Sequence, residues 1–253
     1  MNNISTLITS ALMSVLLISC ADSDSPFTAE GGGGAISTGV VSSKGIDLKS
    51  SEISPTIVEN GAFTQTTLDL AVTISDRNQI IINTPKTIHF RAEWGIFSDT
   101  TGNTCITSAG QCSVSWTSSD PGDVPADLLV RIVAYTVGEE SFSDLNDNNI
   151  FDDADGDSSS FTDTEEPFLD TLQGGVRNGI YDNTPSDTGK SELIDTEGGS
   201  PPEKNQMHDP VDNFYNGPAC QHTTLCHTEF FNVVVWDSIL LDINGDVDNP
   251  PPP

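Results

Sequence analysis

One short segment in the second half of the chain carries oxygen-bearing side chains at every second position. These side chains belong to Asp144, Asn146 and Asn148, and a further carboxylate follows at Asp152. Calcium binds about six to eight oxygens from carboxylates, amides and backbone carbonyls, and alternate residues of a tight turn direct such oxygens inward. Together with the backbone carbonyl of Ile150, these side chains predict a structural calcium site.

A second, looser copy of this pattern follows at Asp170, Asn178 and Asp182. Compared with the first copy, the second has four extra residues, 172–175, between Asp170 and Asn178, so its spacing no longer fits one compact loop. The first copy departs less from the pattern. Asn149 stands where glycine is expected, and asparagine accepts a left-handed backbone better than most residues do. The spacing therefore favours the first site over the second.

Both copies lie in a strongly acidic segment, residues 139–213, which holds 20 of the 38 acidic residues of the chain. The formal net charge is -29 at pH 7, and such a surface repels nucleic acid and anionic lipid head groups. We therefore expect no nucleic-acid partner. Composition alone would also fit an acidic disordered loop, but aromatic residues recur through the segment, which favours a packed one. They are Phe142, Phe151, Phe161, Phe168 and Tyr181.

The first 19 residues carry no charge, and their apolar run at 11–18 is too short to span a bilayer. We interpret residues 1–19 as a signal peptide, which predicts an exported protein. Leu-Ile-Ser-Cys at 17–20 resembles the lipobox of bacterial lipoproteins. That resemblance implies that Cys20 carries acyl chains such as palmitate and that Ala21 directs the anchored protein to the outer membrane. The start of the chain lacks Lys and Arg, so an ordinary secretory signal is the alternative.

The other four cysteines form two close pairs, Cys105 with Cys112 and Cys220 with Cys226. An exported chain oxidises such pairs, so two disulfides are predicted. We expect the first disulfide to clamp a hairpin, because it lies where one strand would turn back on its neighbour.

The second pair, Cys220 and Cys226, would also compose a zinc site with His222 and His227. The intervals between these four residues differ from those of usual zinc ligands. The oxidising compartment therefore favours the disulfide.

Apolar and polar residues alternate with a period of two at 67–75 and 87–94, which is typical of half-buried strands. Shorter apolar runs follow at 113–116, 128–135 and 230–241, separated by Gly, Pro, Asn and Asp. Several short strands with turns between them predict an all-β fold, an immunoglobulin-like antiparallel β-sandwich.

The acidic segment interrupts this strand order, which indicates how the chain is divided. We predict a flexible tether at 20–45, rich in Ser, Gly and Asp, and one sandwich domain at 46–245. Residues 139–213 are an acidic, loop-rich insertion before the last strand, and the ends of that insertion must lie close together. Residues 246–253 are a Pro-rich tail.

Several blocks of sequence follow one another in a recognisable order. They include Thr-Ile-His-Phe-Arg-Ala-Glu-Trp-Gly at 87–95, the cysteine-containing block at 105–121, Gly-Glu-Glu-Ser-Phe at 138–142, the acidic turns and Phe-Tyr-Asn-Gly at 214–217. Together they resemble bacterial Ig-like domains related to the invasin and intimin repeats. The resemblance implies a surface or periplasmic lipoprotein whose Ig-like domain acts in adhesion or as a structural spacer, with an unknown protein or glycan as its partner.

The residue pattern does not indicate a nucleophilic hydrolase. No Gly-x-Ser-x-Gly turn occurs, and disulfides explain the four remaining cysteines. A carboxylate pair for glycoside hydrolysis would be hidden among so many acids, so a hydrolase is the third alternative. The second is a calcium-dependent carbohydrate- or protein-binding module. We expect a protein without enzymatic activity that calcium, bound outside the cell, keeps ordered.

Overall fold

The computed structural model describes residues 37–59, 62–97, 102–119, 123–184, 189–196, 206–228 and 232–243. The predicted signal peptide, Cys20, most of the tether and the Pro-rich tail lie outside these residues. Within them the regular structure is β-strand, and no helix has the length and apolar character needed to cross a membrane.

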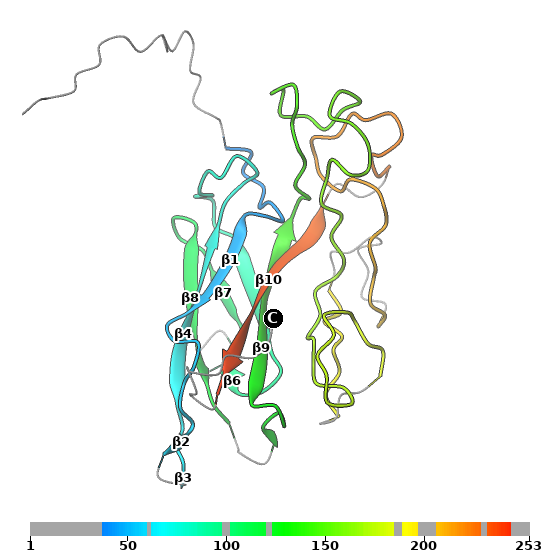
Figure 1. Ribbon diagram of the computed structural model, residues 1–253. Coiled ribbons are helices and arrows are strands. Elements are labelled where there is room, and N and C mark those ends of the chain that lie inside the picture. Colours follow the sequence, from blue (N-terminus) through cyan, green and yellow to red (C-terminus); the bar gives the residue numbers. More distant parts are fainter. Residues whose placement is uncertain are drawn as a thin grey trace, which may run out of the picture. The chain divides into compact units, whose positions relative to one another are not determined.

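Two antiparallel sheets of four strands each form the body of the fold (Figure 1). One sheet has the order β1-β4-β8-β6, and the other has the order β10-β9-β5-β7. A small ladder pairs β2 with β3. The strands are β1 Ile46–Ser50, β2 Val58–Glu59, β3 Ala62–Phe63, β4 Thr67–Ile74, β5 Thr87–Ala92, β6 Ile96–Phe97, β7 Thr104–Ile106, β8 Gln111–Thr117, β9 Leu129–Gly138 and β10 Val233–Asp242.

The core lies between the inward faces of the two sheets. Strand β4 alternates between exposed and buried residues along its whole length, as its period-two pattern predicts. The residues that it buries meet apolar side chains of β5, β8 and β9. The cluster includes Leu68, Leu70, Val72, Ile74, Ile88, Phe90, Val114, Trp116, Val130, Ile132 and Ala134.

The strand order agrees with an immunoglobulin-like arrangement, in which one sheet has the order A-B-E-D and the other places G, F and C side by side. The predicted all-β antiparallel sandwich is therefore confirmed. The strands that the sequence pattern did not predict are β1, β2, β3, β6 and β7, which have five residues or fewer.

Both predicted disulfides are present, and the first closes a tight antiparallel turn in which Ser108 and Gln111 exchange two backbone hydrogen bonds, although the strands on either side of that turn pair in different sheets. Cys105 lies on β7, which pairs with β5, whereas Cys112 lies on β8, which pairs with β4. The disulfide therefore links the two sheets. The reason lies in the turn between the strands, where Ala109 and Gly110 have φ of 50° and 75° and the chain passes from one sheet to the other.

The acidic insertion joins two neighbouring strands. Strands β9 and β10 pair along their whole length, and Val233 is the partner of Gly138. Near the two ends of the predicted insertion, the N–H of Glu140 donates to the carbonyl of Asn216 at 3.1 Å. The excursion between the strands spans residues 139–232, because the described residues after 213 continue as loops up to β10.

The insertion covers the outer face of β9 and β10, on the side away from the other sheet (Figure 1). Val133 on that face packs against Leu169 and Ile194 of the insertion. A separate aromatic cluster lies within the insertion itself, where Phe151, Phe161 and Tyr215 are buried with Phe142 packed against them. Three of the five recurring aromatic residues therefore pack together, and the other two, Phe168 and Tyr181, contact each other with ring centroids 6.3 Å apart.

The predicted tether ends earlier than its composition indicated. Val41 and Ser42 are fully buried, and the backbone N–H of Ser43 donates to the carbonyl of Glu139. Residues 41–45 belong to the folded domain, because the N–H of Ser42 also donates to the carbonyl of Ser75 after β4 and so ties this segment to the sandwich.

Candidate functional site

The first acidic turn folds around the carboxylate of Asp144. Its two oxygens accept hydrogen bonds from the backbone N–H groups of Asn148 at 3.2 Å and Asn149 at 2.7 Å. The side-chain amide of Asn148 donates to Asp152 at 2.7 Å, and that of Asn146 lies 3.3 Å from the same carboxylate. The four predicted side-chain ligands therefore meet within one turn.

The backbone of this turn has the left-handed residue that a compact calcium loop requires at its sharp bend. Asn149, which stands where the pattern expects glycine, has φ of 61°. The backbone N–H of Ile150, whose carbonyl was the fifth predicted ligand, donates to the side-chain oxygen of Asn148 at 2.7 Å. Asparagine thus adopts the left-handed backbone conformation that the bend needs, although glycine would adopt it at a lower conformational energy.

The donor set of the turn suits a hard cation. Two carboxylates, two amide oxygens and a carbonyl are ligands that calcium prefers. No group of three or more His, Cys, Asp or Glu side chains is arranged to hold a metal within the described residues, so a cation here would depend on the amides and the carbonyl too. Hydrogen bonds from the N–H of Ala154 and from Asn148 lower the pKa of Asp152, which keeps this carboxylate charged.

Asp155, which was not among the predicted ligands, closes the turn. It is fully buried, and its two oxygens accept from the N–H of Leu145 at 2.8 Å and from the N–H of Asp152 at 2.9 Å. Counted from Asp144 it stands at the twelfth position, where calcium loops of this spacing place their last carboxylate. That position is the sequence signal that would have identified it.

The second acidic turn keeps the same frame in spite of its extra residues. Glu192 takes the place of Asp155, and its oxygens accept from the N–H of Thr171 and from that of Asp182, both at 2.7 Å. Asn178 repeats the role of Asn148, because its side-chain oxygen accepts from Ile180 N–H at 2.9 Å and its amide donates to Asp182 at 2.9 Å.

The extra residues of the second turn form a small turn of their own, in which Gln173 and Val176 exchange two backbone hydrogen bonds. Asp170 is not joined to Asn178 or Asp182 by a hydrogen bond of the described residues. Its carboxylate forms an ion pair with Arg131 of β9 at 3.1 Å. The structure therefore brings Asn178 and Asp182 together and directs Asp170 toward the sandwich.

Buried glutamates connect the loops of the insertion to one another. Glu140 accepts from the N–H of Thr164 and from that of Asn216, both at 2.8 Å. Glu166 accepts from Thr196 at 2.5 Å and from Asp209 at 3.2 Å, and Glu192 does the same for its own two loops. Each glutamate is followed two positions later by an apolar residue, which is the sequence signal for this arrangement. The pairs are Glu140 with Phe142, Glu166 with Phe168, and Glu192 with Ile194.

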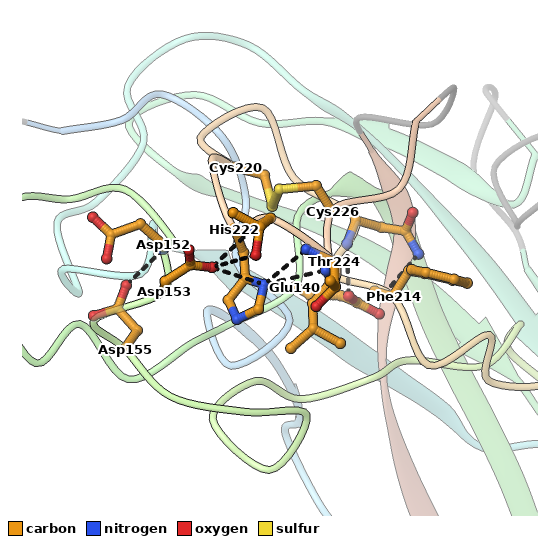
Figure 2. Close-up of a disulfide and its surroundings, with 12 residues drawn as sticks. Glu140, Asp152, Asp153, Asp155, Phe214, Cys220, His222, Thr224 and Cys226 are labelled. Carbon is orange, nitrogen blue, oxygen red and sulfur yellow. Dashed lines mark hydrogen bonds and ion pairs between the residues drawn. A yellow bond between two sulfur atoms is a disulfide. The ribbon is translucent and has the colours of Figure 1, made fainter.

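The second disulfide lies beside the first acidic turn (Figure 2). Cys220 and Cys226 are bonded to each other, which excludes the zinc alternative for their thiolates. His222, between them, lies 3.3 Å from a carboxylate oxygen of Asp153. The N–H of Phe151 donates to the carbonyl of Ala219 at 2.8 Å, so the disulfide loop and the acidic turn share one backbone framework.

Arg77, in the loop after β4, connects the first acidic turn to the sandwich. It forms an ion pair with Glu139 at 3.1 Å, and both side chains are almost completely buried. The same guanidinium donates to the backbone carbonyl of Asn149. The side-chain amide of Asn78 donates to the side-chain oxygen of Asn149 at 3.1 Å. The sandwich therefore helps to fix the position of the turn.

Comparison with known protein families, curated proteins and solved structures finds no match for this chain. The resemblance to invasin- and intimin-type Ig-like domains therefore stays a prediction from the residues.

Proposed function

We propose that this protein is an exported, lipid-anchored lipoprotein of the bacterial outer membrane whose Ig-like sandwich acts as a structural spacer or in adhesion. Calcium orders the acidic insertion that covers one sheet. Cys20 carries the acyl chains, and the residues between Cys20 and the sandwich link the anchor to the domain. The partner in adhesion is a protein or a glycan.

The geometry of the first acidic turn carries the calcium part of this proposal. Asp144, Asn146, Asn148 and Asp152 gather oxygens in one turn, and Asn149 has the backbone conformation of the bend in a calcium loop. Calcium modules outside the cell bind with dissociation constants of about 0.1 to 1 mM. The ion therefore acts as a structural clamp where calcium is plentiful.

Calcium is expected to raise the melting temperature of the full chain. At 10 mM calcium and a dissociation constant of about 0.1 to 1 mM, the free energy of unfolding increases by about 1.4 to 2.7 kcal/mol. For a chain of this size that corresponds to roughly 3 to 10 °C. Differential scanning calorimetry with calcium and with chelator measures the shift, and native mass spectrometry counts the ions.

Two variants make this test specific. Asp144→Ala removes the central carboxylate of the turn and is expected to abolish most of the calcium effect. Asp157→Ala removes an exposed carboxylate of the same insertion, which accepts hydrogen bonds from the N–H and the hydroxyl of Ser159, and this variant is expected to keep the calcium effect. An equal response of the two variants, or no response of the unmodified chain, would contradict the calcium site.

Replacing the cysteine of the lipobox is expected to release the protein from the membrane. Several acyl chains give durable anchoring, because each buried methylene adds about 0.8 kcal/mol. In cell fractionation the unmodified chain should sediment with membranes and incorporate labelled palmitate. A Cys20→Ala chain should do neither, and sedimentation of that variant with membranes would refute the anchor.

A further inference from the structure

Another part of the insertion repeats the hydrogen-bond frame of the first acidic turn. The carboxylate of Asp163 accepts from the backbone N–H groups of Asp212 at 3.3 Å and Asn213 at 2.6 Å. In the first turn, Asp144 accepts in the same way from two successive N–H groups, at 3.2 Å and 2.7 Å. Asn213 has φ of 64°, close to the 61° of Asn149. Asp163 therefore takes the place of Asp144 in this second frame.

A buried glutamate closes this frame as Asp155 closes the first. Glu140 accepts from the N–H groups of Thr164 and Asn216, both at 2.8 Å. Asp155 accepts from the two corresponding N–H groups of the first turn, at 2.8 Å and 2.9 Å. Asn216 therefore stands where the first turn has Asp152.

The side chains of this frame come from three separate segments of the insertion. Asp163 precedes Asp212 by 49 positions, and Glu140 precedes Asn216 by 76. The ligands of the first turn, in contrast, follow one another within a few residues, so their spacing could be recognised in the sequence. We call Glu140, Asp163 and residues 212–216 the assembled turn.

The side chain of Asn216 indicates that the assembled turn binds a ligand. Asn216 is only 2% exposed, and its side-chain oxygen is buried without a hydrogen bond among the described residues. Its side-chain nitrogen lies between two oxygens, 3.0 Å from the carboxylate of Asp212 and 3.5 Å from the carbonyl of Phe214. A buried acceptor without a donor is costly.

A cation would resolve this cost. Rotation of the Asn216 amide by half a turn exchanges its oxygen and its nitrogen, which brings three oxygens together. Three acceptors cannot satisfy one another, but carboxylate, amide and carbonyl oxygens are the ligands that calcium prefers. The ion is enclosed by its ligands, so the low exposure of the amide oxygen suits this role.

The charges of the assembled turn are also uncompensated. Asp163 and Asp212 form no ion pair with a basic side chain of the described residues, whereas Glu139 and Asp170 each pair with an arginine. Burial and the neighbouring Asp212 raise the pKa of Asp163. A bound divalent cation would offset the repulsion between these two carboxylates.

We propose that the assembled turn binds a calcium ion of its own. The ligands are the carboxylates of Asp163 and Asp212, the carbonyl of Phe214 and the side-chain oxygen of Asn216, and Glu140 closes the turn. Carboxylates alone are not arranged to hold a metal within the described residues, so the neutral oxygens are required here as in the first turn. The inference rests on the proposed role of calcium, but the two turns share no ligand, so either site can fail without the other.

The test counts bound calcium by equilibrium dialysis of the full chain, purified in detergent, against radioactive calcium at up to about 10 mM. Asp212→Asn should bind one ion fewer than the unmodified chain at saturation, and Asp144→Asn should also bind one fewer. The double variant should bind two fewer. An Asp212→Asn chain that keeps every ion, or a double variant that loses no more than Asp144→Asn, would overturn the assembled site. Loss with Asp212→Asn alone would instead contradict only the first turn.

Two further variants make the result specific. Asp157→Asn neutralises an exposed carboxylate of the same insertion and should lose no ion, so an equal loss there would reduce the effect to general charge and overturn the site. Asn216→Asp introduces the carboxylate that the first turn has at this position. It should keep the ion and bind it about threefold or more tightly, and weaker binding would contradict the part assigned to Asn216. Melting curves in chelator show whether each variant is folded.

Discussion

Replacement of Arg177 by Met is expected to lower the free energy of unfolding by about 3 to 5 kcal/mol, because it leaves a buried charge without its partner. The guanidinium contacts Glu93 at 2.9 Å and Asp127 at 2.7 Å, and it donates to the carbonyl of Leu129 at 2.8 Å. The Glu93 side chain is only 1% exposed. Burial raises the pKa of Glu93, and the nearby Arg177 opposes that rise, so loss of the cation leaves an uncompensated carboxylate.

Urea unfolding measures this loss as a lower midpoint. Lys49→Met is the matched control, since it removes a cation from an exposed pair, and a change within about 0.5 kcal/mol is expected. The double variant Arg177→Met with Glu93→Met removes both charges and should recover a substantial part of the loss. A single variant that loses less than about 1 kcal/mol would show that the pair is not a main connection between insertion and sandwich.

Three ion pairs attach the insertion to the sandwich, and two of them, those of Arg177 and Arg77, are buried. Arg177 belongs to the insertion and reaches Glu93 of the sandwich, whereas Arg131 and Arg77 belong to the sandwich and reach the carboxylates of Asp170 and Glu139. In a chain with nine basic residues, three are used at one boundary. The acidic composition of the insertion therefore serves its attachment as well as the proposed calcium site.

The long strands could be predicted from the sequence, whereas the ion pairs between the insertion and the sandwich could not. Period-two alternation identified β4 and β5, because each buries one face. Strands of two or three residues such as β6 and β7 have too few positions to show a period. The ion pairs join residues that are far apart in the chain, so the pattern near Arg177 or Glu93 contains no sign of them.

The two acidic turns also differ in how much of each could be predicted from the sequence. The first was predicted as a set from its spacing, and its four side chains do meet. In the second turn the extra residues fold as a separate turn between Gln173 and Val176, and Asp170 pairs with Arg131 instead of joining Asn178 and Asp182, as the longer spacing indicated. Glu192 replaces Asp155 from a position that no fixed interval would predict.

The stability of the protein is expected to fall as pH rises from about 5 to 8. Burial raises the pKa of Glu139 to about 7 and that of Glu140 to about 8, from an ordinary value of 4.5. In this window the folded chain holds protons that the unfolded chain has lost, so unfolding is favoured with each pH unit, by at most about 1.4 kcal/mol per group. Below about pH 4 the sign reverses, because hydrogen bonds lower the pKa of Asp152, Asp153 and Asp157.

Glu140→Gln separates this effect from the general repulsion among 38 acidic residues, which has the same sign. Glutamine cannot ionise, so the fall in stability between pH 5 and 8 should shrink by about 2 kcal/mol or more, measured by urea unfolding in the presence of chelator. At pH 5 the variant should be less stable by about 1 kcal/mol, because one side-chain oxygen must serve the N–H groups of both Thr164 and Asn216.

The curves of the Glu140→Gln variant and the unmodified chain should therefore converge or cross as pH rises. Glu52→Gln, at an exposed position of the sandwich, is the matched control and should give a curve parallel to that of the unmodified chain. Parallel curves for Glu140→Gln as well would mean that Glu140 is ionised throughout, held by its two N–H donors. A glutamate that gains its charge in the folded state only at high pH makes the contact between the loops of Thr164 and Asn216 the part of the insertion that weakens as pH rises.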